Sequence, residues 1–344
     1  MIGVLVHRLN DPRPLDPRDA RTTFEALVAK RTEDAERVAI LLALARRPTD
    51  AGELTLFVRE MHRRARPFPL PPGDRPIDLC GSGGARTPSF NVSTVSSFVV
   101  AAAGVAVVKH GNRTSRGVCG SSDLLEALGL PVVESLPFGR ATYRKLKLAF
   151  LHAPLYHPAT RAVAAARRTV GIPTVFNKLG PLSNPARVSY QIVGVADPPT
   201  ARCAAEVLRY LGRRRGLTMT SVEGCDEFSP QLDTHTVIWD GRRLLRRTIH
   251  ARDLLPPEDR RGAWGALPPD SAAEEARRVL AGGGGARRGS VLLTAAAALW
   301  IAGKAERLTD GVEQARAALD SGRAESILEE MVALGRRYRH PRRG

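Results

Sequence analysis

The N-terminal part of the chain carries apolar side chains at the three- and four-residue spacing typical of amphipathic helices. The segment 16–30 opens with Asp16, a residue that favours the start of a helix, and places Phe24 and nearby apolar residues on one face. Two further amphipathic segments follow, 33–47 and 50–65, separated by a proline and a second capping aspartate. The pattern predicts three short helices in succession, which form a small helical unit.

A proline-rich connector, residues 67–76, marks a candidate domain boundary, and the pattern changes beyond it. Residues 77–80 and 105–111 are apolar runs that predict buried strands, whereas 121–129 predicts a helix closed by Gly129. The first strand is followed by a Gly-rich loop and an Ala/Val-rich helix. This alternation predicts an α/β domain with a largely parallel sheet.

The rest of the chain continues this pattern and ends in helices. Helices are predicted at 157–168, 290–303 and twice within 308–335, and strands at 174–177, 190–195 and 218–224. The predicted fold class is therefore α/β, with a small all-helical domain joined to a larger α/β domain whose central, mostly parallel sheet is flanked by helices.

Composition is that of an ordinary globular protein. The chain has 344 residues, of which 43% are hydrophobic and 25% charged. At about 150 residues per domain, this length suggests about two domains and a core that needs no disulfide or structural metal. Fibrous and wholly disordered classes are excluded.

The charge balance is strongly basic, with 52 Lys and Arg against 35 Asp and Glu and a net charge of +17. Such a balance is typical of proteins that bind nucleic acid or an anionic surface. Lysine supplies only six of the basic residues, and arginine the remainder. This ratio, together with the high Ala and Gly content, also fits an arginine-rich surface encoded by a GC-rich genome, so both interpretations stay open.

The cysteines and the apolar stretches indicate neither a disulfide framework nor a targeting or membrane segment. Cys80, Cys119, Cys203 and Cys225 show no paired spacing, which argues against a disulfide framework or a zinc site. The apolar run at the start is too short for a signal peptide, and the richest apolar stretch, 96–108, falls short of the roughly 20 residues of a membrane span. We expect a soluble, cytoplasmic protein without a membrane partner.

A glycine-rich loop, GSGGARTPSFNVST at 81–94, lies between a predicted strand and a predicted helix. Backbone N–H groups and a helix N-terminus at such a place can hold a phosphate. Asn91, Ser93 and Thr94 add side-chain donors at the start of the helix. The loop matches neither the P-loop nor GxGxxG, and a simple tight glycine turn is the alternative.

A cationic run, KHGNR at 109–113, lies at the end of the second predicted strand. In an open parallel sheet, ligands bind at the carboxyl ends of the strands. One glycine-rich end and one cationic end together point to a substrate that carries several phosphates.

Two adjacent acids, Asp226 and Glu227, follow another predicted strand. Such carboxylates can ligate Mg²⁺ while the ion keeps waters and substrate phosphates. Adjacent acids are also common in solvated turns, so only a neighbouring phosphate site favours the metal.

The segment 157–185 combines an arginine-bearing helix with a rigid Gly180-Pro181 turn. An arginine that faces a cleft, such as Arg161, Arg167 or Arg168, can hold a carboxylate with two hydrogen bonds. The alternative is that these arginines lie on the surface.

In this order, the motifs resemble the anthranilate phosphoribosyltransferase family, over about residues 15 to 335. The resemblance implies transfer of phosphoribose from phosphoribosyl pyrophosphate to the amine of anthranilate, with release of pyrophosphate, in tryptophan synthesis. The motifs that carry it are GSGG…FNVST, VVKHGNR, GSSDLLEALG, FLHAPLYHPATRAV…RR..GIPTVFNKLGPLSNP and GCDEFSP.

The resemblance also implies the domain organisation. A small helical domain would comprise residues 1–72, with 157–185 contributing, and would mediate formation of a homodimer. Residues 77–156 and 186–340 would form the large α/β domain that binds phosphoribosyl pyrophosphate. Two Mg²⁺ ions per subunit would bind at the pyrophosphate.

The family's functional residues map onto this sequence by motif. Lys109, Asn112 and Arg167 would be catalytic, and Ser93, Asp226 and Glu227 would ligate magnesium. Asn112 and Arg167 would position the aromatic acid, while His110 and Pro181 line its path. The residues that would bind the substrates are Gly81, Gly83, Gly84, Ser89, Asn91, Val92, Ser93, Thr94, Lys109, His110, Gly111, Asn112, Arg113, Ser121, Arg167 and Pro181.

Several positions depart from the family pattern. Ser82 and Ala85 stand where the family usually has Thr and Asp, and Thr294 stands where it has Asn. The family's Ser/Lys-containing run after KHGNR is here TSRGVCGS, with Arg116 and Val118, and the usual HG before the acidic pair is missing. These departures keep two alternatives open: an enzyme that ribosylates another aromatic acid, and a silent relative that binds nucleic acid through its basic surface.

Overall fold

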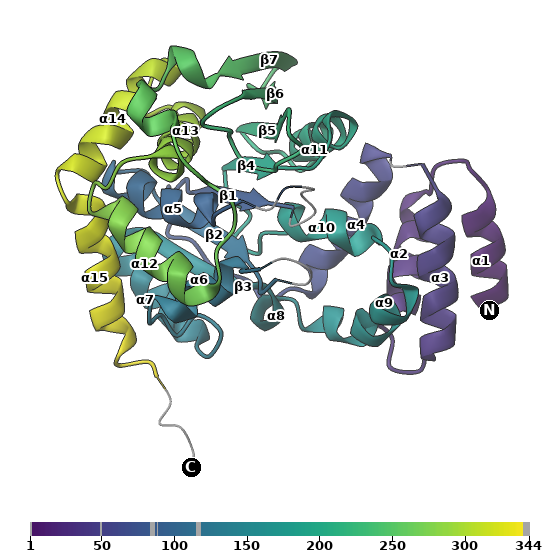
Figure 1. The fold of residues 1–344 in the computed structure, drawn as a ribbon. Coiled ribbons are helices and arrows are strands. Elements are labelled where there is room, and N and C mark those ends of the chain that lie inside the picture. Colours follow the sequence, from purple (N-terminus) through teal and green to yellow (C-terminus); the bar gives the residue numbers. More distant parts are fainter. Residues whose placement is uncertain (1, 49, 83–86, 88, 115–117, 340–344) are drawn as a thin grey trace.

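A seven-stranded sheet forms the centre of the computed structural model, which describes residues 2–48, 50–82, 87, 89–114 and 118–339 (Figure 1). The strand order is β3-β2-β1-β4-β5-β6-β7, in which the first five are parallel and the last two antiparallel. The strands are β1 Ile77–Gly81, β2 Val107–Gly111, β3 Leu148–His152, β4 Tyr190–Gly194, β5 Arg215–Ser221, β6 Asp233–Trp239 and β7 Leu244–His250.

The order follows from the sequence pattern of the strands. β1 to β5 are short and almost wholly buried, as expected of parallel strands covered on both faces. β7 is more exposed and carries Arg246 and Arg247, charges that discourage further pairing at an edge. The mostly parallel sheet flanked by helices is confirmed, with an antiparallel extension at one edge.

Helices from the middle and the C-terminal part of the chain cover one face of the sheet, on the left in Figure 1. The Ala- and Val-rich helices α5 and α13 pack against each other in the largest apolar core, because small side chains let them approach closely. The elements of this part are α5 Val92–Ala102, α6 Ser121–Ala127, α7 Leu136–Leu146, η2 Ala251–Asp253, η3 Pro257–Arg260, α12 Pro269–Leu280, α13 Ala286–Ile301, α14 Leu308–Asp320 and α15 Arg323–Gly335.

A second group of helices, which we call the helical layer, lies on the right in Figure 1. Its later members pack on the N-terminal ones, and the rings of Phe24 and Phe176 lie 6.2 Å apart. The layer consists of α1 Ile2–Asn10, α2 Pro17–Val28, α3 Asp34–Arg46, α4 Ala51–Arg64, α8 Ala153–Tyr156, η1 Pro158–Val163, α9 Ala164–Val170 and α10 Val175–Leu182. It shares one apolar cluster with α11 (Pro198–Tyr210) and part of β4, and the exact division into two domains stays a prediction.

The three predicted N-terminal helices are present as α2 to α4. Asp16 caps α2 by accepting a hydrogen bond from the Asp19 amide at 2.7 Å, and Asp50 caps α4 by accepting one from the Glu53 amide at 2.8 Å. No helix in the described part of the chain is long and apolar enough to cross a membrane.

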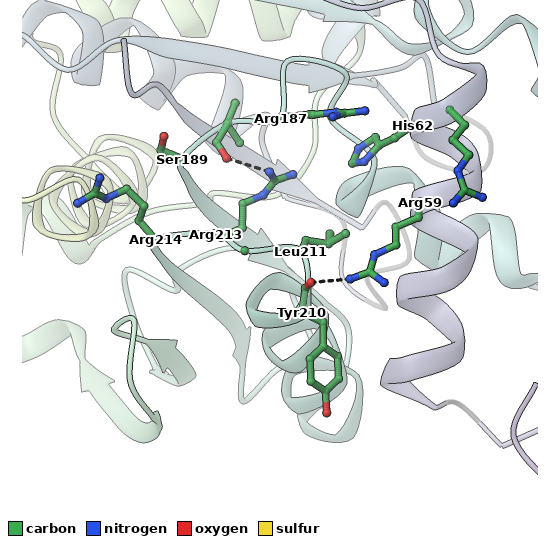
Figure 2. Close-up of a pocket in the computed structure, with 11 residues that line it drawn as sticks. Arg59, His62, Arg187, Ser189, Tyr210, Leu211, Arg213 and Arg214 are labelled. Carbon is green, nitrogen blue, oxygen red and sulfur yellow. Dashed lines mark hydrogen bonds between the residues drawn. The ribbon is translucent and has the colours of Figure 1, made fainter. Parts of the chain in front are cut away.

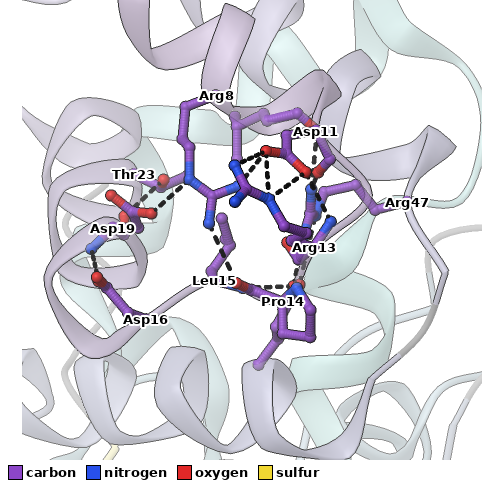
Figure 3. Close-up of polar contacts among 11 residues, drawn as sticks. Arg8, Asp11, Arg13, Pro14, Leu15, Asp16, Asp19, Thr23 and Arg47 are labelled. Atoms are coloured by element: carbon purple, nitrogen blue, oxygen red, sulfur yellow. Dashed lines mark hydrogen bonds and ion pairs between the residues drawn. The ribbon is translucent and has the colours of Figure 1, made fainter.

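The apolar start of the chain forms α1, a helix that the sequence pattern did not predict. It buries Leu5 and Leu9, and polar contacts tie it to the helices that follow (Figure 3). Arg8 Nε donates to Asp19 Oδ2 at 2.7 Å, and Arg47 Nη1, just after α3, donates to the Leu9 carbonyl at 3.0 Å.

The strand predicted at 174–177 is wrong, because a helix, α10, begins there. Its β-branched residues favoured a strand, but a capping box overrides that preference. The Thr174 amide donates to Asn177 Oδ1 at 2.9 Å, which satisfies a donor that an incipient helix would leave unpaired.

Three histidines lie where the helical layer meets the sheet: the buried His110 on β2 and His157 just before η1, and the half-buried His62 on α4. The rings of His110 and His157 are 5.1 Å apart. Burial lowers the pKa of His62 to about 3 and that of His157 to about 4, and holds the pKa of His110 well below its usual value. All three are therefore neutral at neutral pH.

Neutral buried histidines make the fold sensitive to acid. The unfolded chain takes up protons below about pH 6.5 that the folded chain excludes, so the free energy of unfolding should fall as the pH decreases from about 6.5 towards 4. His157→Phe should reduce the slope in this window by up to about 1.4 kcal/mol per pH unit. Urea unfolding at a series of pH values measures it.

The exposed His235 provides the control. His235→Phe should leave the slope unchanged. Equal slopes for the wild type and His157→Phe would show that His157 does not exclude a proton in the folded state.

Candidate active site

Three loops meet at one edge of the sheet, since the carboxyl ends of β1, β2, β4 and β5 point the same way. Thr87 Oγ1, in the loop after β1, donates to the Glu223 carbonyl at 3.1 Å, in the loop after β5. Asn91 Nδ2 donates to the Cys119 carbonyl at 3.0 Å, in the loop after β2. The topology therefore brings together motifs that are far apart in the sequence.

Buried hydrogen bonds join three of the predicted residues at this edge. The Ser93 amide, in the first turn of α5, donates to Glu227 Oε1 at 3.1 Å. Lys109 Nζ, on β2, donates to Ser93 Oγ at 3.1 Å and to the Leu79 carbonyl. The glycine-rich, cationic and acidic motifs thus supply one member each to a single buried cluster.

Glycines at the ends of two strands make room for the acidic pair. A Cβ on Gly81 would lie 2.7 Å from Asp226 Oδ2, and a Cβ on Gly194 only 1.6 Å from the Asp226 carbonyl oxygen. Ser82 Oγ donates to Asp226 Oδ2 at 3.3 Å. The acidic loop can therefore lie directly over the end of β4 only because residue 194 is glycine, while Gly81 leaves room for the Asp226 side chain.

The acidic pair fits a hard divalent cation. Asp226 is 7% and Glu227 4% exposed, and burial together with the neighbouring Asp226 charge raises the pKa of Glu227 to about 8. Among the described residues, Glu227 Oε2 is buried without a hydrogen-bond partner. A cation would compensate this carboxylate, which is otherwise costly to bury.

The acids do not form a complete cage for a metal. Among the residues that the structure describes, no group of three or more His, Cys, Asp or Glu side chains is placed to hold a metal ion. A bound Mg²⁺ would therefore take further oxygens from Ser93, water or a substrate, as this ion commonly does.

The loop after β2 is closely fitted around Ser121, at the start of α6. A Cβ on Gly111 would lie 2.1 Å from Ser121 Oγ. The Asn112 amide donates to Ser121 Oγ, which in turn donates to the Asn112 carbonyl, both at 3.1 Å. Arg113 forms ion pairs with Asp123 and Glu126, so carboxylates already neutralise its charge.

The residues predicted to line the path of the aromatic acid, His110 and Pro181, lie where β2 meets the helical layer. The His110 ring faces His157, and the His110 amide donates to Asp78 Oδ1 at 3.1 Å. The Pro181 carbonyl accepts from Gln191 Nε2 at 2.6 Å and from Cys80 Sγ at 3.4 Å. The end of α10 therefore lies against β1 and β4, close to the phosphate loops.

Arg167 lies in the helical layer, on α9. Its Nη2 donates to Asn177 Oδ1 at 3.4 Å, and its guanidinium lies 5.6 Å from the centre of the Phe176 ring. Burial lowers its pKa. The side chain is a partly buried cation without a carboxylate partner among the described residues.

The other predicted residues lie around the same loops. Ser89 forms a bridge with Gly265, Val92 and Thr94 are buried in the first turn of α5, and Gly83 and Gly84 lie outside the described residues. Of the departures from the family pattern, Val118 is exposed and Thr294 is buried in α13, whereas Ala85 and Arg116 lie outside the described residues.

Sequence reasoning missed a buried polar network beneath the site. Asp78 Oδ2 accepts from Gln191 Nε2 at 3.2 Å, and Arg213 Nε donates to Gln191 Oε1 at 3.2 Å. Burial raises the pKa of Asp78 to about 6. The signal was an aspartate within the apolar strand 77–80, since charged residues in buried strands require partners.

Comparisons with known proteins agree with this geometry. Residues 73–325 match the family described as glycosyl transferase family, a/b domain. The anthranilate phosphoribosyltransferase of Syntrophomonas wolfei is 37% identical over 327 residues, which cover 94% of both chains. That of Desulfitobacterium hafniense is 35% identical over 316 residues, which cover 91% of this chain and 92% of the relative.

Solved structures give the same result. The crystal structure of anthranilate phosphoribosyltransferase from Thermus thermophilus matches with a TM-score of 0.86 and 34% identity, over 96% of this chain and 99% of that one. The yeast enzyme in complex with phosphoribosyl pyrophosphate and Mg shares the fold, with a TM-score of 0.85 at 22% identity, over 98% of both chains. The resemblance in sequence is confirmed, and the chain belongs to the anthranilate phosphoribosyltransferase family.

Proposed function

We propose that the chain transfers the phosphoribosyl group of phosphoribosyl pyrophosphate to the amine of anthranilate and releases pyrophosphate. The observation that carries the proposal is the buried cluster of Lys109, Ser93 and Glu227 at the carboxyl edge of the sheet. A cation, a helix start and a buried carboxylate with one unpaired oxygen are suited to a metal-bound polyphosphate. The curated relatives named for this reaction cover most of the chain.

In this proposal the loops after β1 and β2 hold the phosphates. Lys109 supplies a positive charge from β2, and the first turn of α5 supplies backbone donors near Ser93. The carboxylates of Asp226 and Glu227, with Ser93 Oγ, hold Mg²⁺. The ion, when bound, neutralises negative charge on the departing pyrophosphate. The yeast relative's complex with phosphoribosyl pyrophosphate and Mg supports this assignment, and two ions per subunit stays a prediction.

The aromatic acid would lie between the sheet and the helical layer. Arg167 would pair with its carboxylate, with Asn112 positioning it and neutral His110 and Pro181 lining the path. Support comes from the partial burial of Arg167, which has no carboxylate partner in the described part of the chain, and from the yeast relative's complex with 4-fluoroanthranilate.

The chemistry requires little from a general base. The amine of an aromatic acid is neutral and can attack the anomeric carbon directly, with inversion and an oxocarbenium-like transition state. The residues therefore contribute by holding nucleophile and sugar in line and by stabilising charge on the leaving group.

We also propose that the helical layer mediates a homodimer, which the 76% exposure of Val4 on α1 supports.

A steady-state assay tests the choice of acceptor. Purified protein with phosphoribosyl pyrophosphate and Mg²⁺ should turn over anthranilate far faster than salicylate or benzoate analogues. Turnover of anthranilate no faster than of these analogues would favour another aromatic acid as the substrate. Affinity for DNA that falls steeply with salt, without any turnover, would favour the nucleic-acid alternative.

Asp226→Asn should lower kcat/KM at limiting Mg²⁺ by at least about tenfold, because it removes one negative charge from the proposed metal site. A titration of activity against Mg²⁺ concentration measures the effect, which higher Mg²⁺ should partly reverse. Asp270→Asn, at an exposed position on α12, is the matched control and should not change the titration. Unchanged activity of Asp226→Asn at limiting Mg²⁺ would refute the role.

Arg167→Ala should raise the KM for anthranilate about ten- to hundredfold, the loss expected for a charged hydrogen bond, while the KM for phosphoribosyl pyrophosphate changes little. Arg168→Ala, exposed on the same helix, is the control and should leave both constants unaltered. An unaltered KM for anthranilate in Arg167→Ala would reject the assignment.

A further inference from the structure

A pocket lies at the opposite edge of the sheet, away from the candidate active site. It has a volume of about 370 Å³ and is formed by α4, the end of α11 and the segments that precede β4 and β5. Because β4 and β5 run parallel, these segments are at their amino ends, whereas the proposed metal site is at their carboxyl ends. Figure 2 shows Arg59 and His62 on α4 facing Arg187 and Arg213 across this space.

The pocket is strongly cationic. Five arginines and His62 contribute to its lining, of which Arg214 points its side chain away from the others in Figure 2, and the lining within the described chain contains no Asp or Glu. Of the five, only Arg63 has a carboxylate within ion-pair distance among the described residues, that of Glu60. Nearby arginine charges contribute to the lowered pKa of His62, after burial itself. Asp78 lies close enough to Arg213 to act on its charge, whereas Arg59 and Arg187 have no carboxylate partner among the described residues.

At the floor of the pocket, the fold holds a buried guanidinium group, that of Arg213, in a fixed position. Arg213 is only 5% exposed, and its position is set by hydrogen bonds from Nη1 to the Val188 carbonyl at 2.9 Å and from Nε to Gln191 Oε1. Its remaining nitrogen, Nη2, is buried without a partner in the described structure. A buried donor without an acceptor destabilises the folded protein, and a bound anion would supply the missing acceptor.

Two further arginines are held at the rim. Arg59 Nη2 donates to the Tyr210 carbonyl at 3.1 Å. Arg187 has a φ of 50°, in the left-handed region that residues other than glycine adopt only at a cost. Strained backbone that carries a charged side chain into a pocket is a feature of binding sites.

We propose that this pocket binds a compact polyanion of the di- or triphosphate class. Guanidinium groups pair with phosphate oxygens through two parallel hydrogen bonds, and several of them converging on one cavity match a ligand with several phosphate groups. The ligand is either a free inorganic polyphosphate or the phosphate chain of a nucleotide. Its binding does not depend on the reaction proposed for the carboxyl edge.

The floor of the pocket is connected to the acceptor path by hydrogen bonds. Arg213 holds Gln191, which contacts both Asp78 and the Pro181 carbonyl, and Asp78 accepts from the His110 amide. An anion that engages Arg213 therefore acts on residues that position His110 and Pro181. We expect the bound anion to change the KM for anthranilate, a consequence that rests on the proposed function.

Isothermal titration with sodium tripolyphosphate tests the site, with EDTA present so that no metal supports binding at the carboxyl edge. The wild type should bind saturably, and the double variant Arg59→Ala/Arg187→Ala should bind at least about tenfold more weakly. Arg242→Ala/Arg252→Ala removes the same charge from exposed positions elsewhere and should change the affinity little. Lys109→Ala should retain binding, since Lys109 belongs to the other edge.

Adenosine triphosphate in place of tripolyphosphate distinguishes the two sources, because a nucleotide ligand should bind more tightly than its phosphate chain alone. Thermal unfolding of each variant verifies the fold, and Arg59→Lys/Arg187→Lys provides a second, conservative pair that should bind with intermediate affinity. Absence of saturable binding to the wild type, or equal losses in the pocket pair and the control pair, would overturn the site. Loss of anthranilate turnover with intact tripolyphosphate binding would instead count only against the proposed function.

Discussion

The hydrogen bond between the Ser93 amide and the Glu227 carboxylate joins segments 134 residues apart, and the candidate site depends on it. It fixes the acidic loop against the first turn of α5, while Lys109 reaches Ser93 from the adjoining strand. The position of the acidic loop also requires glycine at 194, where a Cβ would lie 1.6 Å from the Asp226 carbonyl oxygen. A buried carboxylate pair is costly without a cation, so this arrangement favours metal binding over stability.

The junction between the helical layer and the sheet differs from the acidic cluster in its charge. There the fold buries imidazoles in their neutral form and places Arg167 on α9, without a carboxylate partner in the described chain. An aromatic acid brings its own negative charge, and an arginine with no competing carboxylate is free to receive it. The two halves of the proposed reaction thus have distinct electrostatic surroundings a short distance apart.

The two edges of the parallel strands also differ in charge. Acids gather over the carboxyl ends of β1, β4 and β5, and arginines gather at the amino ends of β4 and β5. From the arginines, hydrogen bonds run through Arg213, Gln191 and Asp78 to the His110 amide on β2. This connection explains why a charged residue is tolerated within the buried strand β1, since its carboxylate accepts bonds from both Gln191 and the His110 amide.

The sequence alone determined the fold class, the order of the strands β1, β2, β4 and β5 along the chain, and the three motifs that meet at the carboxyl edge. These features are local, because apolar periodicity, capping residues and glycine-rich runs act over a few neighbouring residues. It misplaced a strand at 174–177, where the Thr174–Asn177 capping box decides for a helix, and it did not predict α1 or the strands β3, β6 and β7. Only the tertiary structure decided that Ser93, Lys109 and Glu227 touch, that Asp78 is paired with Gln191, and that arginines from α4, the segment before β4 and the segment before β5 share one pocket. Such contacts join residues distant in the chain, and their energies depend on burial and on the charges that packing brings together.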